Sequence, residues 1–135
     1  EDYKLLHKYM SMMPRESLFP QYDSTYNDAY VKFLLYGGSG EIQNSDIRIF
    51  NKVGDAYGFL TDVAYVVDYK NKVEFFLSAT IYCNTDEIFN DDKYDYEAIG
   101  FPFMKNLGQV IYNYELQRQK KNVPDLSAFR IYYPN

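Results

Sequence analysis

Nucleophilic and acid–base side chains are scarce in this chain of 135 residues, which holds one cysteine, one histidine and seven serines. Attack by a thiolate would need Cys83, but Cys83 ends an apolar stretch, where a cysteine is usually a small buried residue. A Ser-His-Asp arrangement would need His7, which lies on a predicted helix beside Tyr3 and Lys4, with nothing to bring it to a serine. We therefore expect His7 in solvent or at the edge of the core, and no catalytic residue of these types.

Carboxylates gather between residues 85 and 97. A single cysteine and a single histidine exclude a Cys/His zinc site, whereas carboxylates suit a hard cation such as Ca²⁺. The segment lacks the spacing and the glycine of an EF-hand loop, and acidic residues ahead of a helix also suit the helix dipole. We expect a solvated helix start, and hence no metal and no cofactor. The acidic residues are Asp86, Glu87, Asp91, Asp92, Asp95 and Glu97.

The most informative segment is residues 48–58, RIFNKVGDAYG, followed by TDVAYVV at 61–67. Its Lys-x-Gly is predicted at a strand end, before a tight turn and a second strand that contains Asp-Val-Ala. This pattern resembles the Lys-Thr-Gly box of the penicillin-recognising serine hydrolases, the class A β-lactamases and DD-peptidases. The hairpin and the long helix that follow have the family's order, so the resemblance covers about residues 46–118.

The resemblance implies a role for each residue of the box. Lys52 would place positive charge beside the substrate carboxylate and the catalytic hydroxyls, and Gly54 would let substrate lie against the strand. The backbone N–H of Asp55 would donate to an oxyanion hole, where the path of the backbone matters more than the side chain. Lys52, Val53 and Gly54 are thus the expected substrate-binding residues, although Val53 lacks the family's hydroxyl and Asp55 adds a negative charge.

The nucleophile of that family, the serine of Ser-x-x-Lys, has no counterpart here, because no serine has a lysine three residues later. Ser-Asp-Asn is also missing; Ser45-Asp46-Ile47 comes closest. We therefore expect residues 1–135 to form one domain, inactive alone, that is the C-terminal part of a longer β-lactamase-like protein. By resemblance only, that protein would be periplasmic, secreted or a lipoprotein, with a cell-wall peptide or β-lactam-like ligand.

Helices are predicted on both sides of a strand-rich middle. Apolar residues at helical spacing predict a helix over 3–13 that Pro14 ends. A second helix is expected over about 25–36, with Gly37 in its C-terminal turn. Its expected buried residues are Tyr26, Tyr30, Phe33 and Leu34. A long helix is expected over about 94–120, regular only from Pro102. Its expected apolar face is Ile99, Phe103, Leu107, Val110, Ile111 and Tyr114.

Three strands are predicted between these helices: 46–53, one within 56–69 after a break at Gly54-Asp55, and 73–82 after a polar turn. Short connections make them antiparallel neighbours. The fold class is thus α+β, an antiparallel sheet of at least three strands packed against the C-terminal and N-terminal helices, a partial β-lactamase-like fold. The tail after Pro124 is expected to be a surface strand or loop.

The composition of the chain limits the kinds of partner that it can bind. The net charge of −5 argues against a general nucleic-acid binder, and no apolar run approaches the roughly 20 residues of a membrane helix. The strand over 73–82 carries one charge, Glu74, so its bare edge would pair with a second copy of the chain or with an absent N-terminal segment.

Two other interpretations remain open. The chain could be an inactive binding or interaction module of the same fold, whose tyrosine-rich surface contacts glycan or protein; the composition includes 16 Tyr. Tyr112 and Tyr114 are candidates for such a surface, or simply for the edge of the core. The chain could also be an unrelated small α+β domain.

Overall fold

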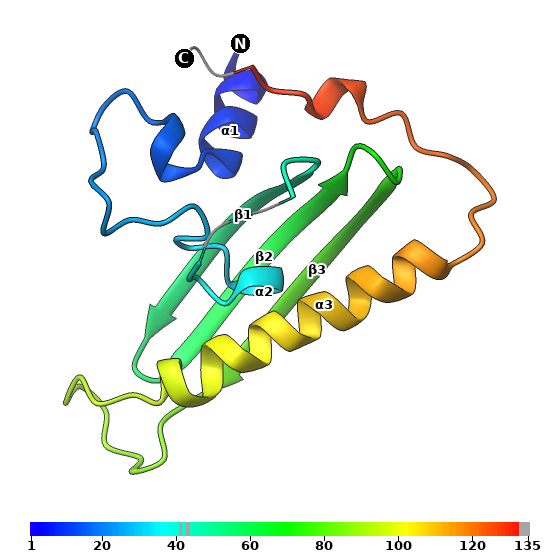
Figure 1. The fold of residues 1–135 in the computed structure, drawn as a ribbon. Coiled ribbons are helices and arrows are strands. Elements are labelled where there is room, and N and C mark those ends of the chain that lie inside the picture. Colours follow the sequence, from blue (N-terminus) through cyan, green and yellow to red (C-terminus); the bar gives the residue numbers. More distant parts are fainter. Residues whose placement is uncertain (41, 43, 133–135) are drawn as a thin grey trace.

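The computed structural model, which describes residues 1–40, 42 and 44–132, is an α+β fold built on one three-stranded sheet (Figure 1). The sequence-based fold class is confirmed at this level. The last three residues of the predicted tail lie outside the described residues. The helices are α1 (Asp2–Ser11), α2 (Phe33–Tyr36) and α3 (Phe101–Gln117), with a π-helical turn at Tyr96–Gly100 and 3-10 turns at Pro14–Glu16 and Ser127–Phe129; the strands are β1 (Ile47–Ala56), β2 (Phe59–Asp68) and β3 (Val73–Tyr82).

The sheet is antiparallel in the order β1-β2-β3. The predicted break at Gly54-Asp55 is wrong, because β1 continues to Ala56, which pairs with Phe59. The turn lies instead at Tyr57 and Gly58, whose φ angles of 53° and 86° are those of the two-residue turns that match strand twist. The polar turn before β3 and the bounds of β3 itself are as predicted.

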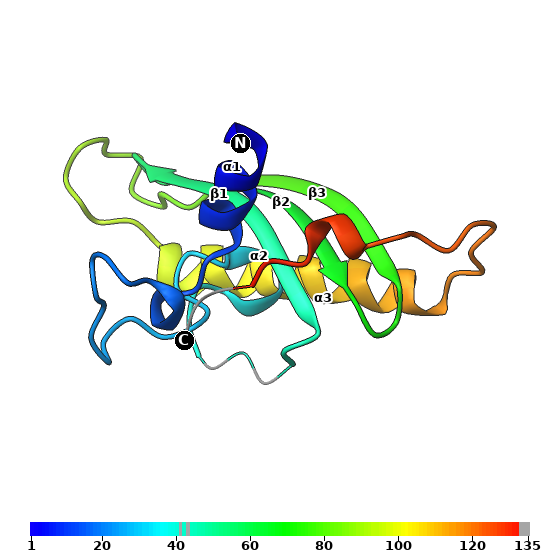
Figure 2. The same ribbon diagram turned by 90° about the horizontal axis from the view of Figure 1, so that it is seen from above.

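Helices α2 and α3 cover one face of the sheet, whereas α1 and the C-terminal segment lie against part of the other (Figure 2). The main core lies beneath α2 and α3 and includes Leu34, Leu60, Val66 and Met104, all fully buried. On the opposite face, Phe50 and Val67 pack with Leu126. The tail is thus partly docked: Ser127–Phe129 forms a 3-10 turn, and Leu126 is buried.

Helix α3 lies so close to α2 that glycine is required at the crossing. A Cβ atom built on Gly108 would lie 2.4 Å from the backbone nitrogen of Leu35. The predicted apolar face of this helix is therefore rotated: Met104 and Gly108 are its buried residues, while Val110 and Tyr114 are more than 60% exposed.

The helix predicted over 25–36 is mostly wrong. Only α2 forms there, and Val31 and Leu35 on either side of Lys32 have φ angles of 54° and 77°, which a continuous right-handed helix cannot contain. Tyr26 and Tyr30 are consequently exposed rather than buried. Phe33 and Leu34 are buried as predicted, and Gly37, with φ 71°, ends α2 in the left-handed conformation. No helix among the described residues is long and apolar enough to cross a membrane.

Candidate functional site

The predicted Lys-Val-Gly box lies inside the edge strand β1 rather than at a strand end. Lys52 is exposed, and its ammonium donates to the carbonyl oxygen of Val53 at 2.6 Å. Lys52 pairs with Val63, and Val63 pairs with Ser78 of β3, so the three lie in one row across the sheet. Two strand spacings separate Lys52 from Ser78, about 10 Å, which is far beyond the distance for proton transfer.

The face that carries this row is largely open to solvent. We call it the open face, and its strand residues are Lys52, Gly54, Ala56, Phe59, Thr61, Val63, Phe76, Ser78, Thr80 and Tyr82. A Cβ atom on Gly54 would meet nothing within 4 Å. Asp55 is three residues after Lys52 and therefore lies on the opposite side of the strand, in a hollow with Tyr57 and Tyr96. None of the described pockets includes Lys52, Val53 or Gly54.

The other residues with catalytic side chains have structural surroundings. His7 stacks on Phe129 at 5.3 Å between ring centroids, which confirms its place at the edge of a core. Cys83 is buried as predicted, and burial raises the pKa of its thiol. In the acidic segment, Asp95 accepts hydrogen bonds from the backbone and hydroxyl of Thr85. The described residues contain no group of three His, Cys, Asp or Glu that could hold a metal ion.

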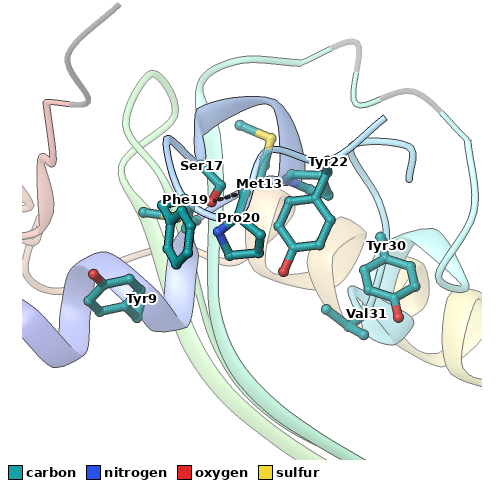
Figure 3. Close-up of a pocket in the computed structure, with 10 residues that line it drawn as sticks. Tyr9, Met13, Ser17, Phe19, Pro20, Tyr22, Tyr30 and Val31 are labelled. Carbon is teal, nitrogen blue, oxygen red and sulfur yellow. Dashed lines mark hydrogen bonds between the residues drawn. The ribbon is translucent and has the colours of Figure 1, made fainter. Parts of the chain in front are cut away.

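A concave site does exist, between α1 and the segment that follows it. We call it the aromatic pocket: a cavity of about 250 Å³. Figure 3 shows Tyr9 at one end, Tyr30 with Val31 at the other, and Phe19, Pro20 and Tyr22 between them. Its ten described lining residues are Tyr9, Met12, Met13, Pro14, Ser17, Phe19, Pro20, Tyr22, Tyr30 and Val31. None of these has a charged side chain, and four carry aromatic rings that are 42–92% exposed.

One ion pair holds the base of this pocket to the sheet, and a second joins the two ends of the loop. Glu16 accepts two hydrogen bonds from the guanidinium of Arg48 on β1, at 2.8 and 2.9 Å, and also accepts one from the backbone of Met13. Arg15 pairs with Asp28 at 2.5 Å. The loop that carries the aromatic rings is therefore anchored at both ends, although the rings themselves face solvent.

Three polar residues buried beneath the pocket fix its two walls; we call them the buried polar cluster, Lys32, Asn51 and Asp62. The ammonium of Lys32 donates to the carbonyl of Met10 in α1 at 2.9 Å, to the carbonyl of Ile49 in β1 at 3.2 Å and to the side-chain oxygen of Asn51 at 2.7 Å. Lys32 thereby links the helix that carries Tyr9 to the sheet.

The same cluster holds the opposite wall. The amide of Asn51 donates to the carbonyl of Val31 at 2.8 Å and to Asp62 at 2.9 Å. Asp62 also accepts from the backbone N–H of Leu34 at 3.0 Å. Val31 is β-branched and adopts φ 54°, a strained conformation that persists only where the surroundings enforce it. The cluster supplies that enforcement.

Burial shifts the ionisation of this cluster. It lowers the pKa of Lys32 to about 8, and the attraction of the nearby Asp62 carboxylate offsets only part of this effect. Burial also raises the pKa of Asp62, and the hydrogen bonds that Asp62 accepts offset only part of that rise. Lys32 is 3% exposed and Asp62 is fully buried. The cluster is hydrogen-bonded within the protein, so we assign it a structural role in shaping the pocket.

Neither this cluster nor the pocket was predicted from the sequence; the tyrosine-rich surface expected there named Tyr112 and Tyr114, which lie outside the pocket lining. Lys32, Asn51 and Asp62 are spread over thirty residues with no recognisable spacing. A weak signal is Lys32 itself, a cation that separates the apolar pair Phe33-Leu34 from Tyr30 within the helix predicted over about 25–36.

Comparison of the chain with protein-family models, with curated proteins and with solved structures gives no match.

Proposed function

We propose that this chain is a non-catalytic binding module, which takes up a neutral and partly apolar ligand in the aromatic pocket. The observation that carries the proposal is the lining: exposed aromatic rings around a cavity, with no charged side chain among the described lining residues. Concave sites lined by apolar and aromatic groups with a few polar atoms are the usual form of ligand sites.

The exposure of the rings also supports binding. Phe19 is 92% exposed and Tyr22 is 43% exposed, although both lie on a loop anchored by ion pairs. Exposed apolar groups gathered in one place mark interaction sites more often than single ones do. Tyrosine suits such a site because its ring is rigid and apolar while its hydroxyl stays hydrated.

The hydrolase fragment remains a second candidate. Three antiparallel strands followed by a long helix are compatible with the order expected for it. Its support is weaker, because Lys52 lies on the open face without a pocket and is separated from Ser78 by a whole strand.

The absence of tryptophan from the chain allows a direct test. A Phe19→Trp variant places a single indole at the pocket rim, and its fluorescence can be excited apart from the tyrosines. The probes are blocked decaproline and the β-1,4-linked tetramer of N-acetylglucosamine, both neutral, with blocked decaglutamate and decalysine as charged controls. We expect a saturable change in emission with at least one neutral probe.

The matched variants separate the pocket from the rest of the surface. Tyr30→Ala in the reporter background should weaken the response at least tenfold, whereas Tyr114→Ala, at a position on α3 that is 61% exposed against 42% for Tyr30, should leave it unchanged. The proposal fails if no neutral probe changes the emission at millimolar concentration, or if both alanine variants respond alike.

A further inference from the structure

We propose that the ligand of the aromatic pocket is an extended, proline-rich peptide segment. This inference rests on the proposed function and names its ligand class. Aromatic-lined grooves bind polyproline II segments because rings pack against proline and because the segment is already ordered before binding.

The separation of two lining rings lies within the reach of that segment. The ring centroids of Tyr22 and Tyr26 are 5.0 Å apart and those of Tyr26 and Tyr30 are 4.9 Å apart. The rings of Tyr22 and Tyr30 are therefore separated by no more than about 10 Å, and a polyproline II helix repeats every three residues, or about 9 Å. One face of a short peptide of this kind is therefore long enough to contact both rings at once.

The polar atoms of the pocket also suit the hydrogen-bonding groups of a polyproline II segment. The hydroxyls of Tyr9, Tyr22 and Tyr30 donate to no acceptor within the described part of the chain, and those of Tyr22 and Tyr30 point to the same side in Figure 3. A polyproline II segment has no internal hydrogen bonds, so its carbonyls are available as acceptors. Proline has no backbone N–H, and the lining has no carboxylate or side-chain amide that would accept one.

The small number of polar groups in the lining disfavours a glycan ligand, although tyrosines often contact sugars. A sugar ring presents several hydroxyls, and each loses its water on burial unless it gains a partner. Tyrosine hydroxyls and Ser17 are the side-chain polar groups of the described lining, and the Ser17 hydroxyl already donates to the carbonyl of Pro20 at 2.7 Å. Charged peptides find no opposite charge in the lining.

The test titrates blocked decaproline into the ¹⁵N-labelled whole chain and follows backbone amide shifts. A blocked Gly-Ser decapeptide serves as the proline-free control. We expect saturable shifts for residues 9–31 with decaproline and none with the control. Tyr22→Phe and Tyr30→Phe should each weaken binding about three- to tenfold, as the loss of one hydrogen bond predicts, while Tyr114→Phe should not change it. Tyr22→Ala should weaken binding more than tenfold.

Three results would overturn the inference: no saturable shift with decaproline, equal binding by the Gly-Ser peptide, or tighter binding of the N-acetylglucosamine tetramer. The phenylalanine variants keep the ring and lose only an exposed hydroxyl, so their folding is not at risk, and unchanged affinity in both would also count against the inference. If decaproline does not bind while another neutral probe changes the emission of the Phe19→Trp reporter, the proposed binding function is supported and only the proline-rich ligand class is refuted.

Discussion

The ammonium of Lys32 lies 2.7 Å from the side-chain oxygen of Asn51, in a cluster that also reaches the fully buried Asp62. Through these contacts α1, the loop at Val31 and the two strands β1 and β2 are joined beneath the aromatic pocket. The pocket is thus held by polar groups that no ligand would touch, and its stability can be changed without altering the lining.

Lys32→Met should destabilise the fold strongly. The substitution leaves three acceptors without a donor and Asp62 without its compensating charge, so we expect a loss of about 3 kcal/mol in the free energy of unfolding. Lys52→Met is the matched control on the same sheet, and because Lys52 is exposed it should change the free energy by less than about 0.5 kcal/mol. Urea unfolding of both variants measures the difference; equal losses would refute the structural role of the cluster.

The stability contributed by Lys32 should depend on pH. The pKa of Lys32 is lowered to about 8 in the fold, from 10.5, so between these values the unfolded chain binds more protons. Stability should therefore rise with pH across this window, by up to about 3 kcal/mol, and the contribution is lost as pH falls through 8. The charges that influence Lys32 are Asp62, Arg48 and Glu16.

The measurement is urea unfolding between pH 7.5 and 10, for the wild type and for Lys32→Met. The variant removes the titrating group and keeps the tyrosines, so the difference between the two slopes isolates Lys32. Identical slopes would show that Lys32 does not titrate in this range.

Gly108→Ala should be destabilising although alanine favours helices by about 1 kcal/mol over glycine. Its Cβ atom would lie 2.4 Å from the nitrogen of Leu35, so α2 and α3 must separate, and we expect a net cost of about 1–3 kcal/mol. Gly54→Ala meets open space and should be neutral within about 0.5 kcal/mol. Thermal unfolding of the two variants compares them; a stabilised Gly108→Ala would mean that the helices do not cross as closely as described.

Fluorescent penicillin should not label this chain. The Val53→Thr variant, which has the Lys-Thr-Gly sequence of the penicillin-recognising family, should also remain unlabelled. Acylation needs an activated hydroxyl, and Ser78, the hydroxyl in the row of Lys52, lies two strands away. Gel fluorescence with mass spectrometry detects any adduct. Labelling of Ser78 would contradict the binding module, and labelling at a Ser-x-x-Lys in a longer product of the reading frame would support the hydrolase interpretation.

The edge of β3 should support association of two copies of the chain. Within the described residues β3 pairs only with β2, it contains neither proline nor lysine, and Phe76 is 81% exposed. We expect a concentration-dependent dimer in sedimentation velocity that Phe76→Lys weakens, whereas Val110→Lys on α3 does not. A monomer at all concentrations, with the amides of residues 73–82 exchanging freely, would exclude pairing through this edge.

The strands were the most predictable part of the fold. The alternation of apolar and polar residues in 73–82 reflects a strand with one face on α3 and one in solvent, so local pattern and tertiary burial agree. The predicted end of β1 is wrong because glycine often marks a break, whereas Gly54 is an extended residue on the open face and the turn uses Tyr57 instead.

The second helix and the site were not predictable by the same means. The spacing of Tyr26, Tyr30 and Phe33 fits a helix, but Val31, whose carbonyl is held by Asn51, and Leu35 are both left-handed, which periodicity cannot reveal. The cluster depends on contacts between residues far apart in sequence. Local pattern includes Lys32 only as one residue of the helix predicted over about 25–36, whereas tertiary hydrogen bonds draw its side chain inside.

The bond from Lys32 to the carbonyl of Met10 also determines how the N-terminal end of the chain can open. Leu5 and Leu6 are more than half exposed, so the first turn of α1, ahead of the packed His7, can fray at little cost. Opening as far as Met10 removes both the packing of His7 and one acceptor of the buried Lys32 ammonium, so the next step is a cooperative one. Limited proteolysis under native conditions should therefore trim the first turn of α1 and then stop.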